Sequence, residues 1–172
     1  MAATNKPTQP ADRSLDSIGV LKRREIEARI LAPVLEALGK EFGRERVLEV
    51  AREAIADVAR RHGRELHERA GGNSLSDFVQ LLPTWEKDGG IEIRVDEQSS
   101  ERLSFDVVRC RFAEMYRELG IPELGALLSC NRDFSMIQGF NPDVELTRTQ
   151  TIVEGASHCD FRFRTRSAGK KD

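Results

Sequence analysis

Residues 91–107 read IEIRVDEQSSERLSFDV, and this stretch decides the fold class of the 172-residue chain. Apolar residues alternate with polar ones on either side of a polar turn at 97–101, at Ile91, Ile93, Val95, Leu103, Phe105 and Val107. A period of two places alternate side chains on opposite faces of a strand, so that one face is buried. The stretch therefore predicts two strands of a sheet that is covered on one side.

The residues before this stretch have a helical period instead. Apolar residues recur every three to four positions over about 20–42 and again over about 44–67, and Gly43 between them is a natural stop. Pro33 predicts a bend or a break in the first helix. Ser74 with Asp77 has the spacing of a capping box, which predicts the start of a third helix. The first stripe is Ile26, Ile30, Val34, Leu38 and Phe42, widened by Leu31 and Leu35.

The residues after the stretch mix both periods. Helical spacing covers about 110–119 and restarts at Pro122, and alternation returns over 144–151 and 158–164. The order of helices, then mixed elements, then a hairpin is typical of an α+β fold. We therefore expect N-terminal helices packed on an antiparallel sheet of about four strands.

Size and charge narrow the class of protein. We expect one domain over 16–166, with flexible ends at 1–15 and 167–172 where the composition is polar. A net charge of -2 gives no reason to expect nucleic acid, and no apolar run approaches the roughly 20 residues that span a bilayer. The absence of a secretory signal, with an odd count of three cysteines, predicts a cytoplasmic protein with reduced thiols.

Reactive side chains gather in the last third of the chain. Cys130 and Asp133 are spaced i, i+3 and share a face if the segment is helical. They are then a nucleophile and its base, two metal ligands, or a buried thiol beside a helix-end carboxylate. Alternation makes Cys159 a core residue, although a bulge after Gly155 would turn it towards Cys130.

The opposite face of the last strand carries a second set of polar residues. His158 and Asp160 form either an acid–base pair or a solvated charge ladder. Zinc accepts S, N and O ligands, so a site built from Cys130, Asp133, His158 and Cys159 is conceivable. The chain has no C-x-x-C or H-x-x-x-H pattern, so we expect no cofactor, with bound zinc or manganese as the alternative.

Five spaced motifs in this region resemble the L-2-amino-thiazoline-4-carboxylic acid hydrolase family. They are CNRD at 130–133, GFNP at 139–142, LTRT at 146–149, Gly155, and CDFRF at 159–163. The resemblance implies hydrolytic opening of a small cyclic amidine, in which water or a cysteine thiolate attacks the ring carbon between sulfur and nitrogen. The product of the named substrate would be a carbamoyl-cysteine.

With this resemblance, a set of candidate site residues follows. An enzyme of this type needs a nucleophile, proton-transferring carboxylates and a cation for the substrate carboxylate. The alternatives are a non-catalytic small-molecule sensor or subunit on the same scaffold, and a scaffold protein whose amphipathic helices pack on partners. The partner expected is a small-molecule substrate, and a homo-oligomer stays open. The catalytic candidates are Cys130, Asp133, Cys159 and Asp160, and the substrate-binding candidates are Arg148 as anion clamp, Thr147 and His158.

Overall fold

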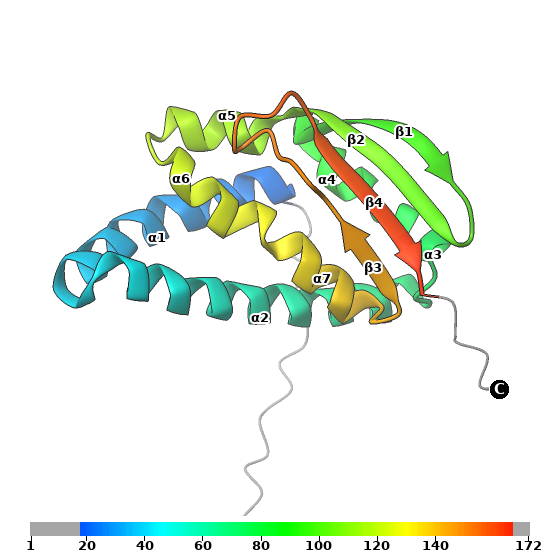
Figure 1. Ribbon diagram of the computed structural model, residues 1–172, viewed down its shortest axis with the longest axis horizontal. Coiled ribbons are helices and arrows are strands. Elements are labelled where there is room, and N and C mark those ends of the chain that lie inside the picture. The colour runs from blue at the N-terminus through cyan, green and yellow to red at the C-terminus, as the bar shows by residue number, and fades with distance from the viewer. Residues whose placement is uncertain (1–17, 167–172) are drawn as a thin grey trace, which may run out of the picture.

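The computed structural model describes residues 18–166 as helices on one side of an antiparallel sheet (Figure 1). This arrangement confirms the α+β prediction, while the flexible ends predicted at 1–15 and 167–172 lie outside the described residues. The elements in chain order are α1 (Val20–Phe42), α2 (Arg44–Ala70), α3 (Leu75–Val79), α4 (Pro83–Glu86), η2 (Lys87–Gly89), β1 (Ile91–Gln98), β2 (Arg102–Cys110), α5 (Arg111–Glu118), α6 (Pro122–Gly125), η3 (Ala126–Cys130), α7 (Arg132–Phe140), β3 (Val144–Thr147) and β4 (Cys159–Thr165).

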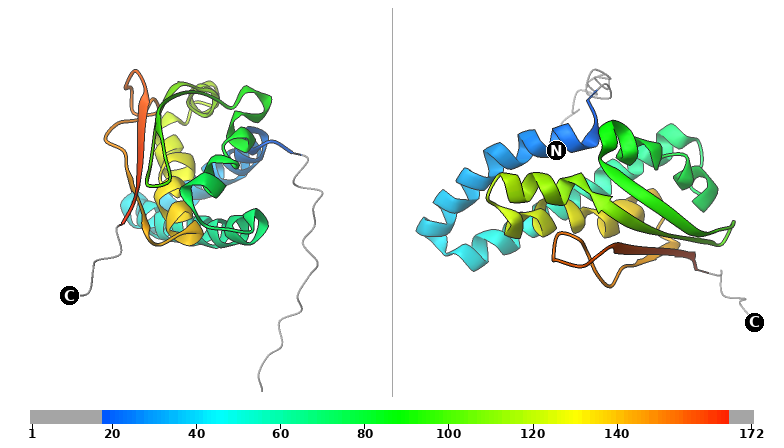
Figure 2. Two further views of the ribbon diagram at one scale, coloured as in Figure 1. Left: turned by 90° about the vertical axis from the view of Figure 1, so that its right-hand side faces the viewer. Right: turned by 90° about the horizontal axis from the view of Figure 1, so that it is seen from above.

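The four strands follow the order β1-β2-β4-β3, and every neighbouring pair is antiparallel. The last strand therefore lies between the first hairpin and its own hairpin partner. Phe105 pairs with Phe161, and Val107 pairs with Cys159, so their side chains share one face of the sheet. Figure 2 shows the helices on that face and none on the other.

The inner face of the sheet forms the larger of two hydrophobic clusters. Phe78 lies at its centre, fully buried, with its ring 5.1 Å from that of Phe163 and 5.4 Å from that of Phe140. A second cluster joins α1 to α5, α6 and η3 around the buried ring of Tyr116. Phe112 packs against both clusters, and it also lines the cavity described below.

Two local details differ from the sequence predictions. Helix α1 continues through Pro33, so this proline does not divide it. Pro83 occupies the first position of the short helix α4, where its missing N–H costs nothing. The third predicted strand stops at Thr147, because the next residues turn their backbone towards Asp160. The capping box of Ser74 and Asp77 is confirmed.

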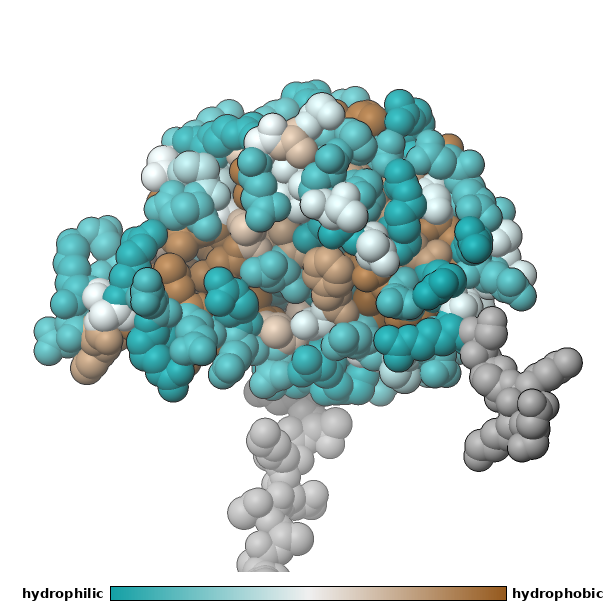
Figure 3. Space-filling view, viewed as in Figure 1, coloured by the Kyte–Doolittle hydropathy of each residue, from teal (hydrophilic) through white to brown (hydrophobic). Residues whose placement is uncertain are grey.

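The apolar stripe of α1 is exposed rather than packed on the core. Its five members keep between 40 and 66% of their surface, and the helix instead buries Ala28. Small and aliphatic residues flanking Ala28 make the inner contact, because α2 lies close against this side. Figure 3 shows a different face, on which β3, β4 and α6 lie in front of α1, and there too apolar residues form a band framed by hydrophilic residues.

Helices α2 and α7 approach each other at two glycines. A Cβ on Gly63 would overlap the carbonyl oxygen of Met136, and a Cβ on Gly139 would overlap that of Arg60. The two backbones therefore touch, which explains why a glycine opens the GFNP motif. This contact holds the second half of α7 against α2, and Asp133 lies in the first turn of the same helix.

We expect Gly63→Ala to destabilise the fold by about 1–3 kcal/mol, the usual cost of overpacking a close contact. The matched control is Gly39→Ala in α1, where the nearest atom to a new Cβ is 3.4 Å away. That change should be neutral or stabilising by up to about 1 kcal/mol, because alanine favours a helix over glycine. Urea unfolding of both variants measures the difference, and equal stabilities would contradict the close contact.

Candidate active site

A cavity of about 400 Å³ lies between the inner face of the sheet and helices α1, α2 and α7. All three thiols of the chain, Cys110, Cys130 and Cys159, line it together with Asp133 and Arg148. The structure therefore brings Cys130, Asp133 and Cys159 into one cavity, as their shared motifs suggested. No bulge is needed, because Cys159 faces the helices by simple alternation with Phe161.

Each of these side chains stands at the end of an element. Cys110 ends β2, and Cys159 begins β4. Cys130 ends η3, a π-helical turn in which the Asn131 N–H donates to the Ala126 carbonyl at 2.9 Å. Such turns are rare and frequent at functional sites. Asp133 follows in the first turn of α7.

Arg148 joins α7 to the segment that follows β3. Its Nη1 donates to Asp133 Oδ2 at 2.6 Å, and its Nη2 donates to the Cys130 carbonyl oxygen at 3.0 Å. The guanidinium lies 5.1 Å from the ring of Phe134 and 5.0 Å from that of Phe161. Only 5% of the Arg148 side chain is exposed, against 23% for Asp133. The arginine is therefore held in place, and its carboxylate partner is the more accessible of the two.

Burial controls the protonation of the whole group. It raises the pKa of the Asp133 carboxyl, and the Arg148 charge and hydrogen bond offset part of that rise. Burial also raises the pKa of the Cys130 thiol, an effect that the charge of Asp133 reinforces. The pKa of Cys110 rises to about 11 and that of Cys159 also rises, both chiefly through burial. All three thiols are therefore protonated at neutral pH.

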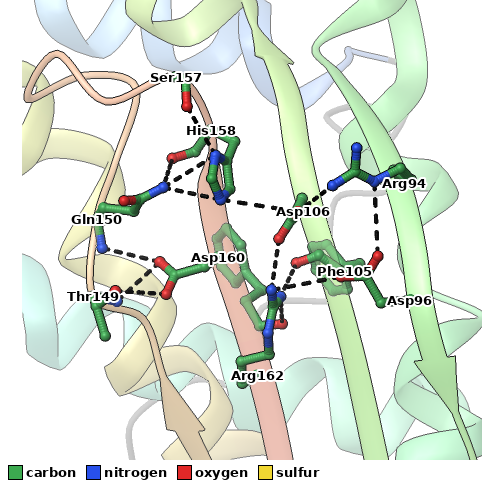
Figure 4. Close-up of polar contacts among 11 residues, drawn as sticks. Arg94, Asp96, Phe105, Asp106, Thr149, Gln150, Ser157, His158, Asp160 and Arg162 are labelled. Carbon is green, nitrogen blue, oxygen red and sulfur yellow. Dashed lines mark hydrogen bonds and ion pairs between the residues drawn. The ribbon is translucent and has the colours of Figure 1, made fainter.

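The other candidate residues lie on the far side of the sheet. His158, Asp160 and Arg162 face away from the helices, where Figure 4 shows them in a network with Asp106. Thr147 is exposed at the end of β3, and none of Thr147, His158 and Asp160 lines the cavity. The strand that brings Cys159 into the cavity necessarily turns its two neighbours outward.

Asp160 fixes the segment that leads out of β3. Its Oδ1 accepts the backbone N–H groups of Thr149 and Gln150, both at 2.9 Å, and its Oδ2 accepts the Thr149 hydroxyl at 2.7 Å. Burial would raise the pKa of Asp160, but these hydrogen bonds hold it below its usual value. Because Arg148 directly precedes this segment, Asp160 sets the backbone from which the Arg148 side chain enters the cavity.

A buried carboxylate that sequence reasoning missed organises the same outer face. Asp106 is 3% exposed and accepts Arg94 Nη2 at 2.7 Å and Arg162 Nη2 at 2.8 Å. The His158 ring lies 3.9 Å away and bonds Gln150 as well (Figure 4). Burial would raise the pKa of Asp106, yet Arg162 and Arg94 hold it below its usual value. The alternation of β2 predicted the outward direction of Asp106 but not its burial.

The lining of the cavity is also rich in basic residues, which the sequence analysis missed as well. Arg23 and Arg24 come from α1, Arg69 from α2 and Arg132 from α7, and all line the cavity with His62. Burial, followed by the charges of Arg24, Arg69, Arg132 and Arg23, lowers the pKa of His62 to about 4. The placement of His62 among the apolar residues of its helix was the available signal, because it implied a buried imidazole.

Neither a metal centre nor a membrane span is found in the part of the chain that the structure describes. Among residues 18–166, no three His, Cys, Asp or Glu side chains are grouped so as to hold a metal ion. No helix in the same range is both long and apolar enough to cross a membrane.

The sequence model of L-2-amino-thiazoline-4-carboxylic acid hydrolases matches residues 23–163. The chain belongs to this family. Membership implies an enzyme that hydrolyses a ring of the L-2-amino-thiazoline-4-carboxylate type, and hence a small-molecule substrate. The match begins in α1 and ends in β4, so it includes Asp133, Arg148 and the other arginines that line the cavity.

Two solved structures are similar to the chain at low identity. A trafficking protein particle complex subunit 3 from Naegleria fowleri, covalently bound to palmitic acid, is 14% identical with a TM-score of 0.51, over 84% of this chain and 95% of that one. This likeness concerns the fold alone. The phenol-responsive sensory domain of the transcription activator PoxR is 12% identical with a TM-score of 0.48, over 78% of this chain and 72% of that one. No curated protein matches the chain.

The lowered pKa of His62 predicts a loss of stability in acid. At pH 7 the imidazole is neutral in both states, but below pH 6.5 the unfolded chain takes up a proton that the folded chain refuses until about pH 4. As the pH falls between these values, the free energy of unfolding of the wild type should decrease by up to about 3 kcal/mol more than that of the His62→Gln variant. Urea unfolding at pH 7 and pH 4.5 tests this, and an equal loss in both proteins would contradict it.

Proposed function

We propose that the cavity is the active site of this hydrolase and that Asp133 accepts the proton of the attacking water. The observation that carries the proposal is the position of Asp133: a carboxyl in the cavity wall, with a raised pKa and an orienting arginine. A general base is most effective when its pKa lies near the working pH. Burial moves the pKa of Asp133 in that direction.

The reaction follows from the chemistry of a cyclic amidine. Water forms a bond to the carbon between ring sulfur and ring nitrogen while Asp133 takes its proton, and the C=N electron pair moves onto the nitrogen. Asp133 then returns the proton to that nitrogen. The ring C–N bond breaks as the new hydroxyl group gives up its proton, which passes through Asp133 to the leaving nitrogen, and a carbonyl forms on the attacked carbon. One water is consumed, and the product carries a carbamoyl group and a free amine.

The thiols support this choice of nucleophile. A cysteine attacks as its thiolate, and burial keeps the three thiols of the cavity protonated. We therefore assign Cys130 and Cys159 to the wall that surrounds the ring, where a polarisable thiol contacts the substrate sulfur. Asp160 acts on the site indirectly, through the backbone that directly follows Arg148.

Asp133→Asn should lower kcat by about 10²–10⁴-fold, because a positioned base contributes that much. Asp160→Asn is the matched control outside the cavity and should lower kcat less, together with the melting temperature. The assay uses L-2-amino-thiazoline-4-carboxylate and follows release of the ring-opened product. If Asp133→Asn melts normally and keeps full activity, the proposed base is wrong.

Cys130→Ala should lower kcat by no more than about tenfold if water is the nucleophile, since covalent catalysis needs the thiolate. Intact-protein mass spectrometry during turnover should show no adduct. A loss as large as that of Asp133→Asn, with an adduct on Cys130 in the wild type, would make the thiol the nucleophile. A protein that binds the ring compound but opens no amidine would instead be a sensor on this scaffold.

We also propose that two copies of the chain associate through α1. The exposed stripe repeats every four residues about Val34, so an antiparallel copy sets Ile26 opposite Phe42 and Ile30 opposite Leu38. Several exposed charges of α1 are paired within the helix, Lys22 and Arg29 with Glu25 and Lys40 with Glu36, so these charges do not oppose the arrangement. Burying large apolar residues that are 40–66% exposed would drive the association.

Val34→Glu should convert this dimer to a monomer, because two like charges would face each other at its centre. The matched control is Val95→Glu on β1, where the valine has nearly the same exposure, 47% against 46%. Sedimentation velocity over a range of concentrations measures the change. A wild type that stays monomeric, or a Val34→Glu protein that stays dimeric, would contradict the α1 interface.

A further inference from the structure

The cavity has far more positive charge than the chemistry at Asp133 uses. Six basic side chains of the described residues line it, against the single carboxylate of Asp133, in a chain whose net charge is -2. Arg148 is paired with that carboxylate. The others are Arg23 and Arg24 from α1, Arg69 from α2, Lys87 from η2 and Arg132 from α7.

Two of these arginines, Arg24 and Arg132, share a single carboxylate. Glu27 accepts both of its short hydrogen bonds from Arg24 Nη1, each at 2.7 Å. The same carboxylate forms an ion pair with Arg132, with Glu27 Oε2 3.5 Å from Arg132 Nη1. One acid therefore serves two guanidinium groups, whose side chains are only 11 and 13% exposed.

Arg23 adds a donor that nothing satisfies. Its Nε is the one buried side-chain N or O atom, within residues 18–166, that lacks a hydrogen-bond partner. Buried donors are normally paired, because leaving one unpaired costs its full desolvation. Arg23 belongs to the cavity wall, so a small rotation of its guanidinium would present the Nε–H to a ligand oxygen in the cavity.

Arg23, Arg24, Arg69 and Arg132 line the same cavity as His62, and Arg24 and Arg132 share the Glu27 carboxylate. The charges of these arginines add to burial in lowering the pKa of His62. Burial, then the charge of Arg24, lowers the pKa of Arg132 to about 10, and Glu27 offsets part of this. Arg132 thus stays charged at neutral pH and is repelled by Arg24, a repulsion that a bound anion relieves.

We propose that Arg23, Arg24 and Arg132, around His62, form an oxyanion subsite that holds the carboxylate or phosphate group of the ligand. Guanidinium groups bind such groups through paired hydrogen bonds, which lysine does not offer. The inference rests on the proposed function in one respect, since it places the substrate carboxylate here and the ring carbon at Asp133. The subsite takes the place of Arg148 as the predicted anion clamp. The role of Arg148 is then to hold Asp133.

The first experiment needs no turnover. Inorganic phosphate is titrated into the full-length protein at pH 7 and constant chloride, and binding is followed by calorimetry and by the melting temperature. Wild type should bind saturably, and Arg23→Gln and Arg132→Gln should each weaken binding at least tenfold. Arg29→Gln is the matched control, since Arg29 lies on the same helix but is 60% exposed and pairs with Glu25. Equal binding by all four proteins, or none by wild type, overturns the subsite.

A second measurement distinguishes an anion site from a structural role of Arg23. The His62 imidazole is followed by NMR, with His62→Gln to assign its signal among the three histidines. Phosphate should raise the pKa of His62, because it neutralises the arginines that depress it, and Arg23→Gln should raise it without phosphate. Arg23→Lys keeps the charge but loses the Nε–H donor, so it should weaken phosphate binding while leaving the low pKa. An unchanged His62 titration in the presence of bound phosphate overturns the location.

Kinetics separate this inference from the proposed reaction. With a carboxylated ring substrate, Arg23→Gln should raise KM at least tenfold with little change in kcat, because the carboxylate is bound equally in ground and transition states. With 2-aminothiazoline, which lacks the carboxylate, KM should not change. If phosphate binds as expected but no ring is opened, the proposed function fails and the subsite stands. If rings are opened and Arg23→Gln has the KM of Arg29→Gln on both substrates, the subsite fails and the function stands.

Discussion

The buried ion pair of Arg148 with Asp133 is the constraint on which the site depends. Taking both charges out of water is costly, and a well-packed apolar pair of similar size would often be as stable. The pair nevertheless joins α7 to the end of β3, and two phenyl rings hold the guanidinium from either side. The ion pair therefore serves to position Asp133: it fixes one carboxylate at a defined place in a cavity whose wall is mostly apolar.

The two faces of the sheet divide the motif residues between two tasks. Residues that alternate along β4 cannot reach the same cavity, so Cys159 faces the ring site while Asp160 faces outward. Asp160 nonetheless bonds the backbone directly after Arg148, and Asp106 anchors Arg162 beside it. The outer network is thus the support of the inner ion pair, and a motif that spans both faces combines chemistry with its scaffold.

Periodicity predicted the fold because each element obeys its own local rule. The alternation at 91–107 and 158–164, and the Ser74–Asp77 cap, were visible without tertiary contacts. Periodicity could not show which apolar stripe is covered, so the face of α1 that contains Val34 proved exposed. The sequence also brought Cys130, Asp133 and Cys159 together, but only through spaced motifs. Arg23 and Arg132 lie more than a hundred residues apart in the sequence. No local pattern indicates that the packing of their helices brings them to the same cavity.

The charges in the cavity also suggest how a substrate would orient itself. An anionic group is attracted to the arginines that line the cavity with His62, whereas an amidine, which is basic, is attracted to Asp133, the single carboxylate of the lining. An anionic group beside Asp133 and a basic group among the arginines are both disfavoured, so the charges favour one orientation. Binding in that orientation places a positive amidinium beside Asp133, which favours the ionised carboxylate against its burial. The substrate would thereby help to create the base that activates the attacking water.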